Sequence, residues 1–488
     1  MKNILVVGSG SAGLIAATIL KKRLNVQVDV LSSSGLDIIG VGEGSTTEFF
    51  EYMKFIGITD SDIIKNCGAT YKSGIMFEGW NDKKDFLHTA SVDFFSTWGQ
   101  YYHAMAKQIS DESDFVCPQH FYNNALDEQY VFDNIRRVKH HPQITQYHFD
   151  SYKLNKFLID ISKGMGINFI DDKIQKVNLS DDGNIKTLMG EVDEYDYDFY
   201  IDATGFKKIL IGEMGAEWKS YGKYLKMNSA ITFETEQEDN YNIWTLSKAM
   251  DAGWLFRIPV QGRYGNGYIF DDNYIDEEQA KVEVEKYFGK EIKVGKKFKF
   301  DPGCLDKSWI KNCCAIGLSS SFIEPLEATS IGSSIQQTFM LMQKLPNYNE
   351  VVIESYNKSF DSLMENLRDF VVMHYVTNKT NTQFWKDVSK LELPKTLKDR
   401  LELWKHKMPV SEDMIEESDY TLFKEYHYII VMHGLGLFDT KSITEEFNMH
   451  SDELKEDAIK VVDRLVEMEK TTHLMKHIDA INLISNAR

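Results

Sequence analysis

The feature that most constrains this chain lies at its start, in the stretch "NILVVGSGSAGLIAATILKKRLNVQVDVLSSS". Residues 4–7 form an unbroken apolar run, as expected of a parallel strand that is buried on both faces. A glycine-rich turn follows, then a helix over residues 12–22 and a second strand over residues 26–31. Strand, glycine turn, helix and strand in this order predict a parallel α/β sheet that binds a dinucleotide.

The turn itself satisfies the pattern G-x-G-x-x-G with Gly8, Gly10 and Gly13. The first glycine makes the tight turn, the second lets a pyrophosphate approach the backbone, and the third lets the helix pack on the strand. The phosphates would then lie at the helix N-terminus, where free N–H groups favour anions, so we expect Ser11 and Ala12 to contact the cofactor as well. A glycine turn without a ligand is the less favoured alternative.

The end of the second strand departs from this pattern. An acid normally binds the ribose hydroxyls there, but the strand runs into Ser32, Ser33 and Ser34. Ser32 can still hydrogen-bond a hydroxyl, without charge assistance, so we expect modest affinity on the adenine side. Further along, "YIDATGF" resembles the second FAD-binding segment of flavoprotein monooxygenases, which implies cofactor contacts at Asp202 and Gly205 and favours FAD over NAD.

Size and composition exclude several classes of protein. A chain of 488 residues exceeds one hydrophobic core, so two or three closely packed domains are expected. A formal net charge of −19 argues against a nucleic-acid partner, and no apolar run is long enough to span a membrane. With no signal peptide expected, we predict a cytoplasmic protein with free thiols. The cysteines are odd in number and lack framework spacing: Cys67, Cys117, Cys304, Cys313 and Cys314.

The remaining patterns predict the domain organisation. Alternating stretches such as "SAITFETE" and "GWLFRIPV" indicate antiparallel strands, whereas apolar residues recur at helical spacing from about residue 350 onward. We therefore predict an α/β fold with an FAD-binding, Rossmann-like domain of the flavoprotein monooxygenase type over residues 1–345. An antiparallel β insertion at approximately 210–300 interrupts it, and a mainly helical, substrate-side region covers residues 346–488.

Several segments together resemble the flavin-dependent halogenases, the tryptophan halogenase family. They are "GVGEGSTTEFF", "CGATYKSGIMFEGW", "YHFDSYKLNKFL", "IDATGF", "NCCAIGLSSSFIEPLEATSI" and "NLRDFVVMHYV", in the family's order. The resemblance covers residues 1–385 and fades beyond, where relatives select their substrates. It implies that Lys72 and Glu327 are catalytic. It also implies further flavin contacts at Gly40, Val41, Gly42, Glu43 and Ile331.

In that family, reduced FAD and O2 oxidise a halide ion to hypohalous acid, which travels to a separate substrate pocket. The resemblance implies that Lys72 holds the oxidised halogen there and that Glu327 assists its transfer or accepts the ring proton. The residues fit these roles, because apolar neighbours can desolvate Lys72 and lower its pKa, and a nearby glutamate can take up a proton. On local sequence alone, Lys72 reads as a snorkelling surface lysine and Glu327 as a first-turn helix acid.

Two positions depart from the family pattern. The motif W-x-W-x-I-P, which keeps substrates away from the flavin, reads "WLFRIP", so Phe256 replaces the second tryptophan after Trp254. Phenylalanine preserves a flat apolar wall and drops the indole N–H. The halide-binding Ser-Thr-Gly becomes Ala328, Thr329 and Ser330. Thr329 and Ser330 remain our predicted halide contacts, and the lost donor penalises strongly hydrated chloride more than bromide or iodide.

Histidines His88, His103, His148 and His374 lack metal-ligand spacing, so we predict core or hydrogen-bonded histidines and no metal site. The leading hypothesis is an FAD-dependent halogenase of a small aromatic such as an indole or phenol. Because no second dinucleotide motif is present, a separate flavin reductase would supply reduced FAD. The rivals are a flavin-dependent aromatic hydroxylase and a non-catalytic flavin-binding relative. The sequence leaves open whether the substrate is carrier-bound and whether the protein is a homo-oligomer.

Overall fold

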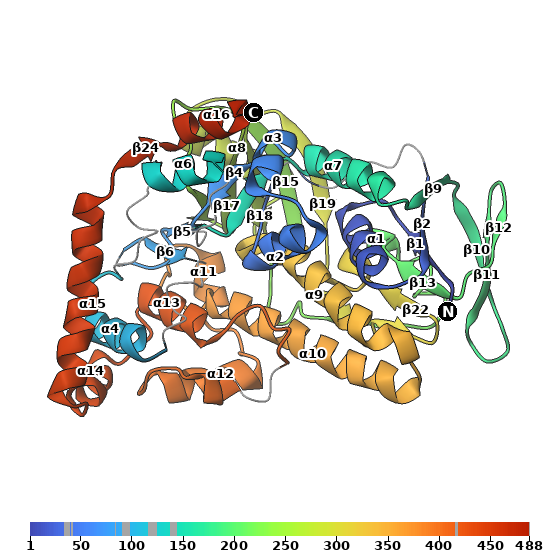
Figure 1. The fold of residues 1–488 in the computed structure, drawn as a ribbon. Coiled ribbons are helices and arrows are strands. Elements are labelled where there is room, and N and C mark those ends of the chain that lie inside the picture. Colours follow the sequence, from blue (N-terminus) through green and yellow to red (C-terminus); the bar gives the residue numbers. More distant parts are fainter. Residues whose placement is uncertain are drawn as a thin grey trace.

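The computed structural model describes residues 1–33, 40, 42–82, 84–89, 98–115, 124–136, 144–414 and 418–487. Figure 1 shows the chain in sequence colours, with the predicted nucleotide-binding elements toward the N-terminal label, most of the C-terminal helices along the lower and left edges, and the C-terminus at the top. Val41 and Cys117 lie outside the described residues. The other four cysteines are buried free thiols, as predicted.

The predicted parallel sheet is present. In the described part of the chain, a six-stranded sheet has the order β21-β22-β13-β1-β2-β9. β1 (Asn3–Val7) lies at its centre and pairs in parallel with β2 (Gln27–Ser32) and β13 (Phe199–Asp202). The outer strands are β9 (Asn168–Asp171), β22 (Cys313–Ala315) and β21 (Trp309–Ile310), of which only β21 runs antiparallel to its neighbour. The predicted α/β fold class is confirmed.

Three helices cover this sheet next to the glycine turn. α1 (Ser11–Arg23) follows the turn and packs against α7 (Ser151–Gly164) and α9 (Thr329–Lys344). Asp150 caps α7, because its side chain accepts from the backbone N–H groups of Tyr152 and Lys153. A small antiparallel sheet lies at the right-hand edge of Figure 1. It consists of β10 (Ile174–Leu179), β11 (Ile185–Gly190) and β12 (Glu194–Tyr195).

A second large sheet carries the alternating stretches. Among the described residues it has seven strands in the order β19-β15-β18-β17-β16-β5-β6. Five come from the predicted insertion: β15 (Ser229–Glu236), β16 (Trp244–Met250), β17 (Gly253–Val260), β18 (Arg263–Phe270) and β19 (Val294–Lys299). The sheet is completed by β5 (Gly74–Glu78) and β6 (Phe86–Thr89), and β5 pairs in parallel with β16. The segment that follows Lys72 therefore belongs to the same sheet as the insertion.

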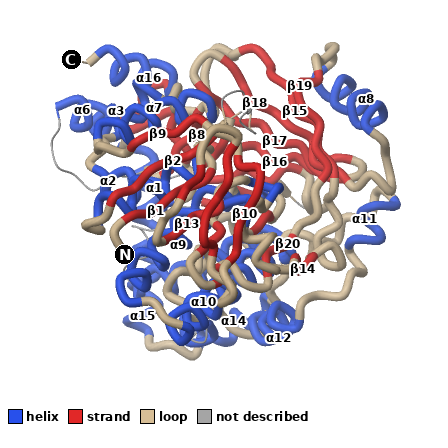
Figure 2. Tube along the Cα trace, turned by 90° about the vertical axis from the view of Figure 1, so that its right-hand side faces the viewer, coloured by secondary structure: helices blue, strands red, loops and turns tan. Residues whose placement is uncertain are grey.

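A short sheet carries the predicted catalytic lysine and packs against strands β16 and β17 of the second large sheet. It consists of β3 (Glu43–Gly44), β8 (Gln146–Phe149) and β4 (Thr70–Lys72), with β8 in the middle. Figure 2 shows the strands of the sheets in the middle of the molecule, with helices around them. Helix α2 (Thr47–Ile56) follows β3 and packs on α9.

The C-terminal part is mainly helical. Its helices are α10 (Glu350–Met373), α11 (Gln383–Val388), α12 (Lys395–Trp404), α13 (Glu425–Leu435), α14 (Thr440–Asn448), α15 (Asp452–Thr471) and α16 (His477–Asn486). The long α15 packs against α4 (Trp98–Ser110) at the left of Figure 1. β24 (Leu474–Lys476) then pairs with β7 (Ala125–Asp127), and α16 packs on α3 (Asp60–Asn66) and α6 (Glu128–Arg136).

The parallel sheet, the second large sheet and the C-terminal helices share the main hydrophobic core. One cluster joins Ile4 of β1, Trp254 of β17 and Phe360 of α10, each at most 1% exposed. The predicted domains thus share one core and are not separate units joined by a linker. The domain boundary between residues 345 and 346 stays a prediction. None of the helices in the described ranges is both long and apolar enough to cross a membrane.

Candidate active site

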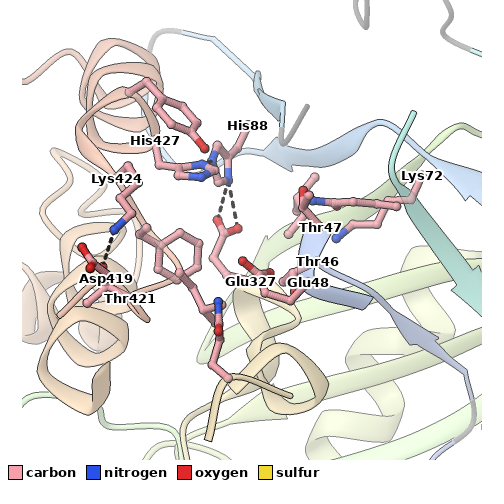
Figure 3. Close-up of a pocket in the computed structure, with 16 residues that line it drawn as sticks. Thr46, Thr47, Glu48, Lys72, His88, Glu327, Asp419, Thr421, Lys424 and His427 are labelled. Atoms are coloured by element: carbon pink, nitrogen blue, oxygen red, sulfur yellow. Dashed lines mark hydrogen bonds and ion pairs between the residues drawn. The ribbon is translucent and has the colours of Figure 1, made fainter. Parts of the chain in front are cut away.

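A cavity of about 280 Å³ lies where the short sheet, the 3-10 turn before α9 and the C-terminal helix α13 meet. Both predicted catalytic residues, Lys72 and Glu327, line it. Figure 3 shows Glu327 directed toward His88 and His427, while Lys72 enters from the side of Thr46 and Thr47. Segments around residues 46–48, 72–75, 88, 146, 327–336 and 419–427 therefore line one small cavity.

Lys72 is the last residue of β4 and is held by backbone pairing. β4 runs antiparallel to β8, with Lys72 opposite Gln146. The side chain is only 2% exposed, and its Nζ donates a hydrogen bond of 2.7 Å to the carbonyl oxygen of Ser45. Burial lowers the pKa of Lys72 to about 8, against the opposing effect of the Glu327 carboxylate. Lys72 is a buried amine that titrates near neutrality, not a snorkelling surface lysine.

The backbone around Glu327 aims its carboxylate into the cavity. Glu327 ends the 3-10 turn Pro325–Glu327, and Ala328 follows with φ 56° and ψ 35° before α9 begins at Thr329. This left-handed conformation costs a residue with a Cβ roughly 1–2 kcal/mol. It separates Glu327 from the helix, so Glu327 is not an acid of the first turn of α9.

Two histidines flank the Glu327 carboxylate. His88 Nδ1 lies 3.0 Å from Oε1 and 2.9 Å from Oε2, and His374 Nε2 lies 2.8 Å from Oε1. Glu327 is 3% exposed, and its burial raises the pKa, but the neighbouring histidines outweigh that effect and hold the pKa of Glu327 below its ordinary value. The carboxyl group is therefore ionised.

The glycine turn fits a dinucleotide. A Cβ on Gly8 would lie 2.2 Å from the carbonyl oxygen of Ala203, and one on Gly13 would lie 2.0 Å from that of Gly8, so β1, β13 and α1 pack too closely for side chains. At Gly10, by contrast, no atom lies within 4 Å of a Cβ position. The N-terminus of α1 has no side-chain cap. Open space beside uncapped N–H groups suits a pyrophosphate.

The loop after β13 is organised by Asp202. Its carboxylate accepts hydrogen bonds from the backbone N–H and the hydroxyl of Thr204 at 2.9 and 2.7 Å. It also accepts the N–H groups of Leu210 and Ile211 at 2.8 and 2.9 Å. Gly205 has φ +69°, which favours glycine. Four donors account for most of the capacity of a carboxylate, and cofactor contacts at Asp202 and Gly205 stay predictions.

The predicted flavin loop lies against α7 and the turn between β17 and β18. A Cβ on Gly40 would meet Ser151, and one on Gly42 would meet Val260 at 3.5 Å. Burial raises the pKa of Glu43 to about 7. Ser32 ends β2, and Ile331 is buried in the first turn of α9 after Thr329 and Ser330.

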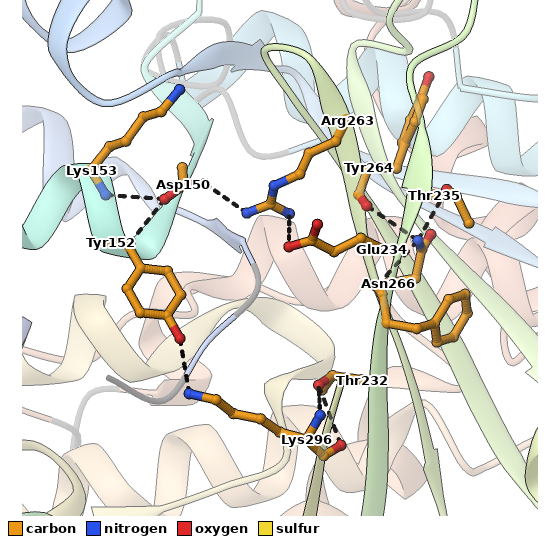
Figure 4. A network of polar contacts seen from close by, with 11 residues as sticks. Asp150, Tyr152, Lys153, Thr232, Glu234, Thr235, Arg263, Tyr264, Asn266 and Lys296 are labelled. Carbon is orange, nitrogen blue, oxygen red and sulfur yellow. Dashed lines mark hydrogen bonds and ion pairs between the residues drawn. The ribbon is translucent and has the colours of Figure 1, made fainter. Parts of the chain in front are cut away.

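A polar network ties α7 to the second large sheet beside this loop, as Figure 4 shows. Arg263 of β18 donates to Asp150 at 2.6 Å and lies 3.4 Å from Glu234. Lys296 of β19 donates to the Tyr152 hydroxyl at 2.9 Å. These contacts fix the cap of α7, and with it the Gly40 side of the flavin loop, relative to the sheet.

Comparison with known proteins decides the family. The family model for tryptophan halogenase matches residues 3–447. The chain belongs to the tryptophan halogenase family. This flavin-dependent halogenase is 28% identical over 467 residues to tryptophan 6-halogenase SttH of Streptomyces toxytricini, covering 89% of each chain. It is also 28% identical over 471 residues to 7-chloro-L-tryptophan 6-halogenase KtzR of Kutzneria, covering 90% of this chain and 91% of KtzR.

Solved structures agree with this membership. Xcc4156, a flavin-dependent halogenase from Xanthomonas campestris, superimposes with a TM-score of 0.83 at 26% identity and covers 100% of this chain and 99% of its own. The predicted resemblance and the prediction of an enzyme are confirmed. The predicted reduced FAD, O2 and halide are the cofactors of this halogenase family, and its members act on aromatic substrates with a separate flavin reductase.

Three of the four histidines that the sequence singled out have polar contacts in the structure. His88 and His374 are hydrogen-bonded or ion-paired to Glu327, and His148 lies within hydrogen-bonding distance of Thr70 and Thr245. No group of potential metal ligands occurs among the residues that the structure describes. Sequence reasoning missed that His88 and His374 flank the carboxylate, because no spacing marks side chains that converge from separate strands and helices.

A second acid was also missed. Glu324, three residues before Glu327, is fully buried, and burial raises its pKa to about 8. This carboxyl group is neutral near pH 7 and lies beside the first tryptophan of "WLFRIP". The proline between Glu324 and Glu327 was the sequence feature that could have indicated this second acid. Proline favours a tight turn, and a tight turn can direct two nearby acids to different sides.

Proposed function

We propose that this halogenase transfers an oxidised halogen from Lys72 to an electron-rich aromatic such as an indole or phenol, with Glu327 as proton acceptor. One observation carries the proposal: Lys72 and Glu327 line the same cavity of about 280 Å³. That volume lies near the lower end of the range for small-molecule sites, which favours a compact ring system. The tryptophan named for the relatives supports an indole.

Gly8, Gly10 and Gly13 would hold reduced FAD, which with O2 would provide the oxidising equivalent that converts a halide to hypohalous acid. The protein then has to hold the halogen and remove a proton. Lys72, whose pKa burial lowers to about 8, offers a neutral amine more readily than an exposed lysine does. Glu327, ionised between two histidines, accepts the proton that the halogenated ring carbon loses.

The other predicted site residues belong to the same proposal. The cofactor contacts are Ser11, Ala12, Ser32, Gly40, Val41, Gly42, Glu43, Asp202, Gly205 and Ile331. Thr329 and Ser330, the first residues of α9, bind the halide with their backbone N–H groups and hydroxyls. Ala328 provides no side-chain cap there, which supports a preference for bromide or iodide over chloride.

The proposal includes a separate flavin reductase and a cytoplasmic location. It leaves the oligomeric state and a carrier-bound substrate open. Phe256 packs its ring over Gly267, where a Cβ would approach the ring to 2.4 Å. This close packing supports a flat apolar wall at the position where relatives carry a second tryptophan, so that substrates stay away from the flavin.

The test combines the purified protein with a flavin reductase, NADH, FAD, O2 and each halide in turn. Indole and phenol serve as probes, and mass spectrometry identifies the product. We expect halogenated product from the parent protein and a loss of at least about 100-fold in Lys72→Ala, in line with loss of a nucleophilic group. Oxidation of reduced FAD continues in that variant, because Lys72 does not belong to the glycine turn.

Lys54→Ala is the matched control, since Lys54 is 69% exposed on α2, where it lies 3.9 Å from Glu51 and over the Phe50 ring, away from the cavity. Parent-like product from Lys72→Ala would contradict the role of Lys72. An oxygenated product that survives Lys72→Ala would support the hydroxylase instead. Bound flavin without any halogenated product from either probe would favour the non-catalytic relative.

A further inference from the structure

The strand that carries Lys72 is held by a residue from the far end of the chain. β4 lies at the edge of the short sheet and pairs with β8, and alternation in an antiparallel pair leaves the N–H of Tyr71 facing away from β8. This N–H donates to Nε2 of His477 at 3.1 Å, across 406 positions of sequence. His477 is the first residue of α16, is fully buried, and lies beyond residue 447, where the match to the family model ends.

The two outward-facing N–H groups of this strand lie on either side of Lys72. Tyr71, which precedes Lys72, donates to His477, and Ser73, which follows it, donates to the carbonyl oxygen of Ile243 at 2.6 Å. The second acceptor belongs to the backbone and is present whatever the side chain at position 243. The first acceptor is a side chain, so a substitution at position 477 can remove it.

The geometry of this contact fixes the state of the imidazole. A backbone N–H can only donate, so Nε2 of His477 offers its lone pair and carries no hydrogen. Burial also lowers the pKa of His477 to about 4. The ring is therefore neutral at pH 7 and available as an acceptor.

The C-terminal segment (residues 474–487) holds His477 at this place. β24 pairs with β7, and the N–H of His477 donates to the carbonyl oxygen of Asn124 at 2.9 Å. The next N–H, of Ile478, donates to the side chain of Asn240 at 3.0 Å, and Asn240 donates to the same Asn124 oxygen at 2.8 Å. α16 then packs in the buried cluster that contains Tyr71. The imidazole is thus fixed from both sides of its own residue.

Lys72 has little room to follow a displaced strand. Its Nζ donates to the carbonyl oxygen of Ser45 at 2.7 Å, just after β3. A Cβ on Gly44 of β3 would lie 3.4 Å from the Cδ, Cε and Nζ atoms of Lys72, so the side chain lies directly along that strand. A displacement of β4 relative to β3 would therefore break the Ser45 contact and move the amine within the cavity.

We propose that His477 is a positioning residue for Lys72, because its imidazole holds the outer edge of β4 and thereby keeps the amine in place for halogen transfer. The proposal rests on Lys72 as the halogen carrier of the proposed function. His477 does not line the cavity, so it acts through the backbone of Tyr71 and does not touch the substrate. The C-terminal segment, which lies outside the match to the family model, thus contributes to the reaction.

Three substitutions separate the acceptor from the packing of the ring. His477→Gln keeps an acceptor oxygen near the place of Nε2, His477→Phe keeps a ring without an acceptor, and His477→Leu removes both. Loss of the acceptor predicts the same defect in the Phe and Leu variants and rescue in the Gln variant. A role in packing alone predicts that His477→Phe resembles the parent. His473→Phe is the matched control, because His473 lies just before β24 and is exposed.

The first test follows the hydrogen bond itself and needs no turnover. Hydrogen exchange of the intact chain is read by mass spectrometry on the peptide that contains Tyr71. In His477→Phe and His477→Leu we expect exchange there to be roughly 10-fold faster, the equivalent of one lost hydrogen bond, while His477→Gln and His473→Phe stay close to the parent. Parent-like exchange in both acceptor-free variants would overturn the proposal.

A measurement on the parent protein keeps the proposal testable even if the acceptor-free variants fail to fold. ¹⁵N-histidine NMR reports which ring nitrogen carries hydrogen, and His477→Gln assigns the signal. We expect hydrogen on Nδ1 and none on Nε2 of His477 at pH 7. Hydrogen on Nε2 would exclude the bond from Tyr71 and overturn the proposal.

The second test follows the position of Lys72. In the two acceptor-free variants the displaced amine regains water, so we expect its pKa to rise from about 8 toward the ordinary value of a lysine. ¹⁵N-lysine NMR titration measures this pKa, which a merely stabilising role of His477 would not move. An unchanged pKa in both variants would show that Lys72 keeps its place without His477.

The third test measures turnover of indole or phenol, whichever the parent halogenates. In His477→Phe and His477→Leu we expect kcat to fall by about 10- to 100-fold, as for a displaced reacting group, with KM and FAD affinity little changed. His477→Gln should retain most of the rate. Acceptor-free variants with the kcat of His473→Phe would overturn the proposal. If the parent makes no halogenated product, the proposed function fails, and hydrogen exchange and the Lys72 titration still decide whether His477 positions the lysine.

Discussion

At the scale of single residues, the coupling of Lys72 to Glu327 has a defined sign. The carboxylate stabilises the ammonium form and so raises a pKa that burial lowers to about 8. Glu327→Gln removes the negative charge, so we expect the pKa of Lys72 to fall below 8 and the neutral amine to dominate at lower pH. NMR titration of ¹⁵N-lysine would measure this shift.

Asp419→Asn is the matched control for this titration, because Asp419 lines the same cavity without contributing to the pKa shift of Lys72. We expect a smaller change there. A Lys72 pKa that rises or stays the same in Glu327→Gln would show that the two side chains do not interact across the cavity.

Also at the residue scale, Ala328 tests the halide preference. Its left-handed backbone joins the Glu327 turn to α9, and it offers no hydroxyl to the helix N-terminus. Ala328→Ser restores one donor, worth about 1 kcal/mol or somewhat more next to an anion, so we expect the chloride-to-bromide product ratio to rise by roughly 5- to 10-fold. Competition between equal concentrations of the two halides gives this ratio. An unchanged or lower ratio would contradict the role of Ala328.

At the scale of elements, substitutions at two glycines of the turn between β1 and α1 should distinguish an effect on folding from an effect on cofactor binding. In Gly13→Ala the new Cβ would lie 2.0 Å from the carbonyl oxygen of Gly8, so α1 must move off β1. We expect a loss of about 1–3 kcal/mol in the free energy of unfolding and weak FAD binding. Denaturant unfolding without FAD and a flavin fluorescence titration measure the two effects.

Gly10→Ala is the contrasting variant. Gly10 has φ −68° and ψ 171°, and no atom lies within 4 Å of a Cβ there. The apoprotein should keep its stability, while the methyl group occupies the space that a pyrophosphate needs and weakens FAD binding. Equal stability loss in both variants, or unchanged FAD affinity in Gly10→Ala, would contradict this account of the turn.

At the scale of the whole molecule, the cavity depends on a shared core. Trp254 of the second sheet, Phe370 of α10 and Tyr428 of α13 belong to one buried cluster together with β1. Packing in this cluster places α13 against β6, and His427 therefore lies within hydrogen-bonding distance of His88. The C-terminal region therefore supplies one wall of the site.

The sequence alone determined the nucleotide-binding half and the family. Gly8, Gly10 and Gly13 lie within a few residues of each other, and the spacing of apolar residues reflects local secondary structure. The strand, the turn and the helix can therefore be predicted from the sequence without knowledge of the tertiary structure. Motif order was sufficient to single out Lys72 and Glu327. Neither kind of information depends on distant contacts.

Only the tertiary structure decided the electrostatics of the site. Whether Lys72 is buried, which histidines face Glu327, and that Glu324 lies neutral beside Trp254 depend on strands and helices hundreds of residues apart. Burial and Coulomb interactions act through space and leave no periodic trace in the sequence. The contacts of His88 with Glu327 and His427 exist because the fold brings three separate segments to one cavity.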